Sequence, residues 1–377
     1  IDLTLQPGDL SELLDTTAVM AGLDPLTPIL GPFPAYELPL VRGEQFRTLA
    51  GVGVFQPITQ QWLIGSGIEV AEADRDIATA EYDRTTAELR EGVERIFAGL
   101  KYAHWQVAAR EATVAAMEAQ LQDAQNGLAA GEVLAPLVLG AQAALMDART
   151  EALKAHQERE SLQWKLADLI GWEGDATTIE ISEDSLPSRP DQSLTAWLAR
   201  VELNPDLRAA AATVRKASAG TRAAQQGRIP ELGAFATFTY QDGLPLLPNQ
   251  TGTVGLAMTW DVFGFGRRDA EIRRGLAREL QANLNEERVA EDLRREVRET
   301  YQMWIHAGEL VELAEQVEDY RSQLMVQTQA ALQAGEALDS KVRQDEADYA
   351  AAVADRVGAQ TKRHLARLRL QFLTGDL

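Results

Sequence analysis

The sequence predicts a mainly α-helical fold with a smaller β part, built from one unit that occurs twice. The first observation is a repeat: an offset of 204 residues places Gly131-Glu132 on Gly335-Glu336 without a gap. The second is the absence of proline from residues 58–135 and from the chain after Pro248, which allows very long helices there. The third is a pair of strand-like segments before each of these stretches. Each repeat is therefore predicted to hold a strand pair followed by a long helical hairpin.

The composition excludes several classes of function. The formal net charge is −21, which argues against nucleic acid as a partner, because binding phosphates needs clustered lysine and arginine. Cysteine is absent, so disulfides, thiolate metal sites and thiol nucleophiles are excluded. The most apolar helical stretch, residues 133–146, is too short to cross a bilayer, so entry into a membrane would use strands. No signal peptide is visible, and a start at Ile1 is consistent with a leader that precedes it.

Each repeat is predicted to begin with two short strands. They cover residues 35–41 and 48–57 in the first repeat, and 231–240 and 254–263 in the second. The residues expected to contact a membrane lie on the second pair: Phe238, Tyr240, Val254, Leu256, Met258 and Trp260. Strands of about ten residues with one apolar face suit a membrane β-barrel, and an ordinary soluble hairpin is the alternative. Four strands cannot close a hydrated barrel, so membrane strands would require several chains.

Long amphipathic helices are predicted after each strand pair. Apolar residues recur at steps of three and four, as at Val114, Met117 and Leu121, which is typical of a coiled-coil seam. A continuous helix over residues 67–130 would be roughly 95 Å long at about 1.5 Å per residue. Helices of that length suit a periplasm-spanning tube or a fibrous coiled coil rather than a globular domain.

The two Gly-Glu pairs mark the points where the long helices are predicted to reverse. Gly131 and Gly335 can adopt the left-handed conformation that ends a helix. Pro136 suits the first turn of the first return helix, and Asp339 or Ser340 is expected to cap the second. Each pair is therefore interpreted as the turn of a helical hairpin.

Two segments lie outside the repeats. The proline-rich N-terminal segment is predicted to be mostly extended, with a short helix from Asp9 to Met20. In the connector, a short strand is expected at 176–182 and a helix at 193–203, and Asn204-Pro205 is predicted to cap and open another helix. The predicted parts are an irregular segment (1–33), the first repeat (34–171, tip near 131–135), an equatorial connector (172–230) and the second repeat (231–377, tip near 335–339).

Four segments together carry a resemblance to a known family. Residues 229–240 resemble its strand entry, 254–280 its strand-to-helix passage, 129–148 its helix-tip pattern and 203–210 its Asn-Pro helix start. The family is that of the outer-membrane efflux proteins, the TolC-like channels. The resemblance covers roughly residues 34–377.

The resemblance implies a homotrimer in the bacterial outer membrane. Three chains would form one 12-stranded β-barrel in the outer-membrane lipid and an α-helical barrel in the periplasm. Such channels are passive exit ducts of tripartite efflux or type I secretion systems and carry drugs, small molecules or proteins. Their partners are a periplasmic adaptor (membrane fusion) protein and an inner-membrane pump or ABC transporter. Neither an enzymatic activity nor a cofactor is implied.

The resemblance also assigns site residues by position. The adaptor would dock at the tips, which comprise Gly131, Glu132, Val133, Leu134, Gly335, Glu336, Ala337 and Leu338. Many family members carry a constricting ring of acidic residues six and nine positions after the second tip glycine, where this chain has Lys341 and Gln344. The candidate pore constriction is therefore the wider set Asp339, Lys341, Gln344, Asp345 and Asp348.

The N-terminal segment departs from the family pattern. The family places a long helix before the first strand pair, and residues 1–33 do not resemble it, so either residues before Ile1 supply that helix or this member lacks it.

The alternative function is a non-membrane coiled-coil scaffold or interaction protein. The four histidines show no metal-ligand spacing, and no nucleophile or acid–base pair stands out, so an enzyme and a metal site are not expected.

Overall fold

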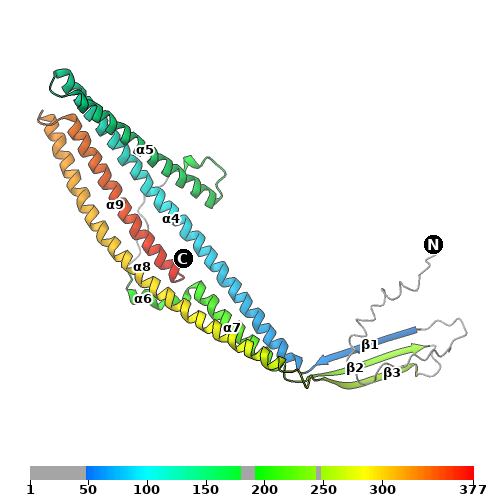
Figure 1. Cartoon of the computed structure of the whole chain (residues 1–377). Coiled ribbons are helices and arrows are strands. Elements are labelled where there is room, and N and C mark those ends of the chain that lie inside the picture. The colour runs from blue at the N-terminus through cyan, green and yellow to red at the C-terminus, as the bar shows by residue number, and fades with distance from the viewer. Residues whose placement is uncertain (1–47, 180–191, 243–247) are drawn as a thin grey trace, which may run out of the picture. The chain divides into compact units, whose positions relative to one another are not determined.

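The computed structural model describes residues 48–179, 192–242 and 248–377. The segment 1–33 and the strand expected at 35–41 lie outside these ranges. In chain order, the elements are β1 (Thr48–Pro57), α4 (Gln60–Ala130), α5 (Ala135–Ile170), the 3-10 helix η2 (Ala176–Thr178), α6 (Leu194–Ala199), the 3-10 helix η3 (Val201–Leu203), α7 (Pro205–Gln226), β2 (Glu231–Asp242), β3 (Gln250–Thr259), α8 (Arg267–Gln333) and α9 (Asp339–Leu373) (Figure 1).

The chain divides into two compact units. The first, here called the strand unit, comprises the described residues within Ile1–Arg75 and Ala212–Asn283. The second, here called the helical unit, comprises Asp76–Ala211 and Leu284–Leu377. Each unit is described by itself.

The strand unit contains an antiparallel sheet with the strand order β1-β2-β3. Val52 lies opposite Phe238, and Ala236 lies opposite Val254, so the apolar positions of all three strands share one face. This apolar face carries Ala50, Val52, Val54, Leu232, Ala234, Ala236, Phe238, Tyr240, Val254, Leu256 and Met258. Small residues dominate the opposite face, mostly glycine and threonine.

Two phenylalanines on the small-residue face explain its glycines. A Cβ atom on Gly233 would lie 2.4 Å from the ring of Phe55, and one on Gly255 would lie 2.7 Å from the ring of Phe235. Each ring therefore covers a glycine on a neighbouring strand. This packing leaves the face nearly smooth and gives the strands a preferred register.

The third strand differs from the prediction of 254–263. It begins at Gln250, because β2 continues to Asp242 and Gln250 pairs with Tyr240. It ends at Thr259, whose partner Glu231 is the first residue of β2. No β2 residue remains to pair with Trp260, so the chain leaves the sheet there.

Polar side chains join the helices of the strand unit. Lys216 on α7 forms an ion pair of 2.6 Å with Asp74 on α4. Ser66 donates a hydrogen bond of 3.1 Å to the Oε1 atom of Gln226. A Cβ atom on Gly275 of α8 would meet Thr221 of α7 at 3.2 Å, so these two helices pack closely. The helices adjoining the sheet are thus tied to one another.

The helical unit contains two hairpins, α4 with α5 and α8 with α9 (Figure 1). A core cluster joins α6, η3, α8 and α9, with buried Trp197, Val201, Leu293, Val297, Trp304, Leu370 and Leu373. Along α4, the buried seam consists largely of alanine rather than of the predicted larger residues, and Val114, Met117 and Leu121 are only half-buried. Small seam residues let neighbouring helix backbones approach closely.

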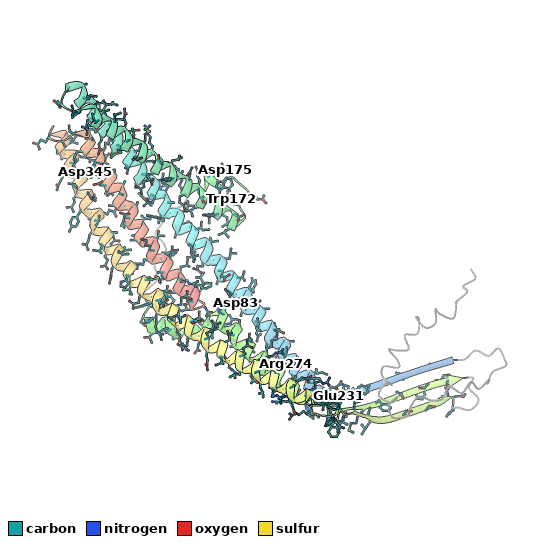
Figure 2. All side chains as sticks on the ribbon, in the orientation of Figure 1. Asp83, Trp172, Asp175, Glu231, Arg274 and Asp345 are labelled. Atoms are coloured by element: carbon teal, nitrogen blue, oxygen red, sulfur yellow. The ribbon has the colours of Figure 1, made fainter. Side chains whose placement is uncertain are left out.

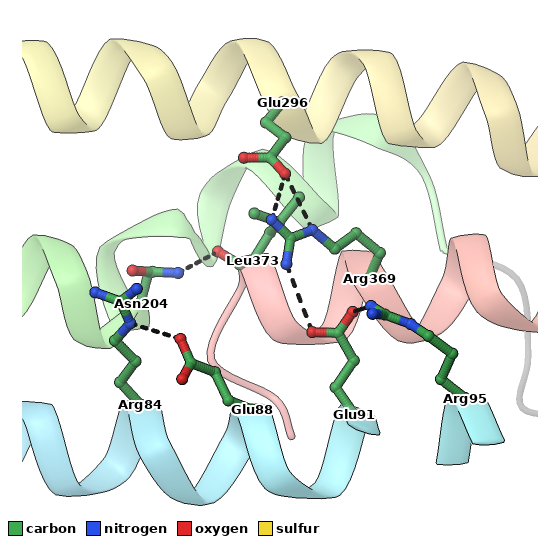
Figure 3. A network of polar contacts seen from close by, with 8 residues as sticks. All are labelled: Arg84, Glu88, Glu91, Arg95, Asn204, Glu296, Arg369 and Leu373. Carbon is green, nitrogen blue, oxygen red and sulfur yellow. Dashed lines mark hydrogen bonds and ion pairs between the residues drawn. The ribbon is translucent and has the colours of Figure 1, made fainter. Parts of the chain in front are cut away.

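The start of α7 and the end of α9 are locked together. The Asn204 side chain accepts a hydrogen bond of 2.8 Å from the Asp206 amide, which confirms the predicted cap, and donates one of 3.0 Å to the Leu373 carbonyl (Figure 3). Gly375 follows with φ 67°, and a Cβ atom there would lie 2.6 Å from the Leu203 carbonyl oxygen. Only glycine fits this contact without a shift.

The connector corrects one expectation. Residues 176–178 form the 3-10 helix η2 rather than the start of a strand. The Asp175 side chain accepts a hydrogen bond of 2.9 Å from the Thr177 amide and thereby caps this turn. The helix expected at 193–203 is present as α6 and η3.

Candidate functional site

The two hairpin turns have the same backbone geometry, 204 residues apart. Gly131 and Gly335 both have φ 78°. The amide of Glu132 donates a hydrogen bond of 2.8 Å to the Gly127 carbonyl, and the equivalent bond from Glu336 to Ala331 is 2.9 Å. Both turns lie at the same end of the helical unit (Figure 1). We refer to residues 131–134 and 335–338 as the two tips.

Each tip presents an acidic residue and an exposed leucine. Glu132 and Glu336 are exposed. Leu134 is 78% exposed and Leu338 is 65% exposed, although both are large apolar side chains. No described atom lies within 4 Å of a Cβ atom built on Gly131 or Gly335, so the backbone of both turns is accessible. Val133 instead folds back onto Gly127, where a Cβ atom would meet it at 3.2 Å.

The return helices begin in the same way. Pro136 lies in the first turn of α5, as predicted, but the expected cap of the second return helix is corrected. Leu134 and Leu338 are the N-cap residues, with extended backbones and no side-chain capping hydrogen bond. Asp339 is the first residue of α9, so neither it nor Ser340 caps the helix. Asp339 instead contributes a negative charge to the first turn, where the helix dipole favours it.

Asp345 does not reach the surface in this conformation. Its side chain is only 1% exposed and lies between α8 and α9, near the tips (Figure 2). It accepts hydrogen bonds of 2.6 Å from both Lys341 Nζ and Thr328 Oγ1. Burial acts to raise the pKa of Asp345, but the hydrogen bonds from Lys341 and Thr328 and the nearby positive charges outweigh it and hold the pKa below its ordinary value. In this chain, the carboxylate links α8 to α9.

Gln344 and Asp348 take part in a chain of contacts across three helices. Gln120 on α4 donates a hydrogen bond of 3.1 Å to Gln344 on α9, which donates one of 2.8 Å to Asp348. Arg321 on α8 donates a further bond of 2.8 Å to Asp348. The two hairpins are therefore tied together near the tips. Of the candidate constriction residues, only Asp339 and Lys341 are more than half exposed.

A second polar network, which sequence reasoning missed, lies deeper in the helical unit. The side chain of Glu91 on α4 is almost buried and pairs with Arg95 and with Arg369 of α9, the latter at 3.5 Å. Arg369 also donates a hydrogen bond of 3.0 Å to Glu296 of α8 (Figure 3). The clue in the sequence was a charged residue at a seam position of α4. Its partner lies 278 residues away, so no local pattern could identify it.

The apolar face of the sheet has no cover among the described residues. Val254 is 85% exposed and Leu256 is 79% exposed, and Phe238, Tyr240 and Met258 are also exposed. Trp260, expected on the same strand, lies directly after it and is also exposed. Water is a poor solvent for such a surface, which favours lipid or protein against it.

Within 48–179, 192–242 and 248–377, no group of three or more His, Asp or Glu side chains is placed to hold a metal ion. In the same ranges, no helix has both the length and the apolar composition needed to cross a bilayer.

His364 is largely buried near Glu94, and burial lowers its pKa more than that carboxylate raises it.

These features define a class: a protein with two long helical hairpins and an antiparallel sheet whose apolar face is exposed. Residues 200–376 match the sequence profile of the outer membrane efflux protein family, which confirms the resemblance found in the sequence. This is a family of channels rather than of enzymes. A search of curated protein sequences finds no match.

Solved structures of outer-membrane proteins share the fold. The outer membrane protein VceC of Vibrio cholerae has 17% identity, with 88% of this chain and 87% of VceC covered, at a TM-score of 0.69. The CmeC outer membrane channel of Campylobacter jejuni has 10% identity, with 96% and 80% covered, at 0.68. The open MtrE outer membrane channel of Neisseria gonorrhoeae has 15% identity, with 88% and 80% covered, at 0.61. The predicted localisation, outer membrane with the helical part in the periplasm, agrees with both comparisons.

Proposed function

We propose that this protein is the outer-membrane exit duct of a tripartite efflux or type I secretion system. The observation that carries the proposal is a sheet with one exposed apolar face and one smooth, small-residue face, joined to hairpins with matching tips. In a membrane barrel the apolar face contacts lipid, and the glycine and threonine face borders a hydrated lumen. Cargo would pass through this lumen without chemical change.

The sheet requires partner chains to form a barrel. Among the described residues, β1 and β3 each pair along one side only, and an unpaired strand edge is not tolerated in lipid. The helical unit also has an apolar groove of about 430 Å³ lined by Tyr102, Leu310 and Val317. Neighbouring chains would pair with the free edges of β1 and β3 and would cover the apolar groove. We propose a homotrimer, with a 12-stranded barrel and a helical barrel, as the resemblance implies.

The matching tips support a role in docking. Leu134 and Leu338 are exposed apolar residues beside accessible glycine backbone, a combination that suits a protein partner. Glu132 and Glu336 add negative charge for basic groups on that partner. We propose that a periplasmic adaptor binds here and joins the duct to an inner-membrane pump or ABC transporter. The 204-residue offset between the tips supports a duplicated unit with the boundaries predicted from the sequence.

The proposed constriction involves fewer residues than the sequence analysis suggested. Asp339 and Lys341 are exposed at the start of α9 and remain the candidates for a ring near the tips. Gln344 and Asp348 would act indirectly, because their contacts with Gln120 and Arg321 fix how the two hairpins lie. Asp345 contributes by holding α8 to α9.

The mass and solubility of the purified protein test this proposal. We expect extraction from membranes only with detergent, and a detergent-stable assembly of three chains that dissociates on heating. The control is the same preparation after heating, which should give the monomer mass. A monomer that is soluble without detergent would instead support the coiled-coil scaffold and contradict the duct.

A further inference from the structure

The segment between β3 and α8, residues 260–266, presents an unusual aromatic group. Phe265 has φ 47°, a left-handed conformation that bulky residues rarely adopt, and is 90% exposed. Phe263 is 72% exposed, and the two rings meet edge to face with 4.7 Å between centroids. Gly264 and Gly266 flank Phe265, and Gly266 also has a positive φ, of 79°. The backbone at Phe265 thus adopts an unfavourable conformation that leaves an apolar ring exposed to solvent in the single chain. This indicates a surface that another molecule covers when the protein functions.

This group lies at the edge of the sheet where strands meet helices. Glu231 pairs with Thr259, and Gly233 pairs with Pro57, so the end of β1, the start of β2 and the end of β3 share this edge. Trp260 directly follows β3, and Trp62 lies in the first turn of α4. Both tryptophans are about half exposed. Aromatic residues at the end of an apolar sheet face are typical of the boundary between lipid tails and headgroups.

Positive charge is concentrated immediately after the aromatic group. Residues 267–278, at the start of α8, contain five arginines and two acidic residues, in a chain whose net charge is −21. Arg267 and Arg268 lie near Asp261, at 3.6 and 3.5 Å. Arg273 and Arg274 are exposed, and neither forms an ion pair with another described residue. This local charge is complementary to an anionic surface.

We propose that residues 260–274 form a lipid-binding collar. Phe263, Phe265 and Trp260 occupy the boundary between acyl chains and headgroups of the bilayer, and Arg273 and Arg274 bind the phosphates of anionic phospholipids. Residues 267–274 extend about 10 Å along the helix at about 1.5 Å per residue. A headgroup layer is roughly 5–8 Å thick, and arginine side chains reach several ångström further, so both arginines remain within reach of the phosphates. The collar rests on the proposed function, because it requires the sheet to lie in the membrane.

The absence of cysteine makes a direct test possible. Single cysteines at Phe265→Cys, Val254→Cys and Glu132→Cys would carry an environment-sensitive fluorophore on the full-length protein in lipid vesicles. Val254 reports whether the sheet is in lipid, and Glu132 at the tip is the control for water. For the Phe265 probe we expect a blue-shifted emission, strong quenching by lipids brominated near the headgroup, and loss of quenching by aqueous iodide.

The three probes separate the possible failures. If the Val254 probe is quenched by brominated lipid and the Phe265 probe is quenched by iodide as strongly as the Glu132 probe, the collar is wrong and the duct stands. If the Phe265 probe is shielded from iodide but insensitive to brominated lipid, protein covers the ring and the collar is also wrong. If the Val254 probe is not in lipid, the proposed function itself fails.

The arginines are tested separately with phosphatidylglycerol. Binding of fluorescent phosphatidylglycerol to the detergent-solubilised protein would be compared between R273Q/R274Q and R298Q, an exposed arginine further along the same helix. We expect the double variant to lose about fivefold in affinity for each arginine removed, and R298Q to bind like the unaltered protein. Equal affinity for all three proteins would overturn the role of the arginines.

Discussion

The contact between Gly375 and Leu203 gives a quantitative prediction with an internal control. Replacing Gly375 with alanine puts a side chain on a residue with φ 67°, and its Cβ atom would lie 2.6 Å from the Leu203 carbonyl oxygen. Gly171 is its counterpart in the other hairpin and has φ 66°, but no described atom lies within 4 Å of a Cβ atom there. The two substitutions therefore share the backbone strain and differ in the steric clash.

The magnitudes follow from these two contributions. Alanine in the left-handed region costs about 1–2 kcal/mol at either glycine. At Gly375 the clash involves backbone, which cannot rotate away, and overpacking of this kind costs about 1–3 kcal/mol more. That extra cost corresponds to roughly 5- to 150-fold in the local opening equilibrium. The buried Leu373 and Thr374 lie next to this contact and would lose their packing when the end of α9 shifts.

Amide hydrogen exchange measures this local opening. In Gly375→Ala, we expect the amides of Asn204 and Thr374 to exchange about 5- to 150-fold faster than the corresponding C-terminal amides of α5 do in Gly171→Ala, each relative to the unaltered protein. Equal acceleration in the two variants would show that the close contact is absent. No acceleration in either would refute the left-handed assignment as well.

Three further predictions concern the helical unit. Because the pKa of Asp345 is lowered in the folded protein, its carboxylate adds stability at any pH above the ordinary aspartate pKa of about 3.9. This stability is lost as the pH falls through the lower pKa of the folded state. Amide exchange in α8 and α9 should therefore accelerate in that pH range, but not in Asp345→Asn. Because the pKa of His364 is lowered in the folded protein, His364 takes up a proton in the unfolded chain at a higher pH than in the folded one. Thermal stability should therefore fall as the pH drops below about 6.5. The fall should be smaller in His364→Gln, and His306→Gln is the control. Under the proposed function, the double variant Leu134→Asp with Leu338→Asp should abolish adaptor-dependent export in cells and leave channel assembly intact. The same change at exposed Leu153 should have no effect. Normal export by the tip variant would contradict docking at the tips.

The sequence was sufficient to predict the hairpins because their signals are local. Proline-free stretches with a helical period give the long helices, and a glycine followed by a second amphipathic run gives each turn. The Asn204-Pro205 cap was predicted for the same reason, since its hydrogen bond joins residues two positions apart. The repeat offset added a further check, because it relates Gly131 to Gly335 independently of any propensity.

The features that the sequence did not predict depend on distant partners. The ends of β3 are set by its pairing with β2 rather than by its own alternation of residues. Burial of Asp345 requires α8 to lie alongside α9, and a constriction assigned by sequence position cannot take that into account. Glu91 on α4 and Arg369 on α9 meet only after these two helices, distant in the sequence, have packed together. The aromatic group at Phe265 was visible as letters, but its exposure and its positive φ were not.

Ion conductance across a planar lipid bilayer tests most directly whether this protein is a duct. The purified assembly should insert and give discrete, stepwise increases in current, because pooled strands enclose a hydrated lumen lined by glycine and threonine. Heating the sample to dissociate the assembly before the measurement should abolish the steps. A preparation that remains assembled in detergent and binds to the bilayer, yet never conducts ions, would contradict the proposed duct.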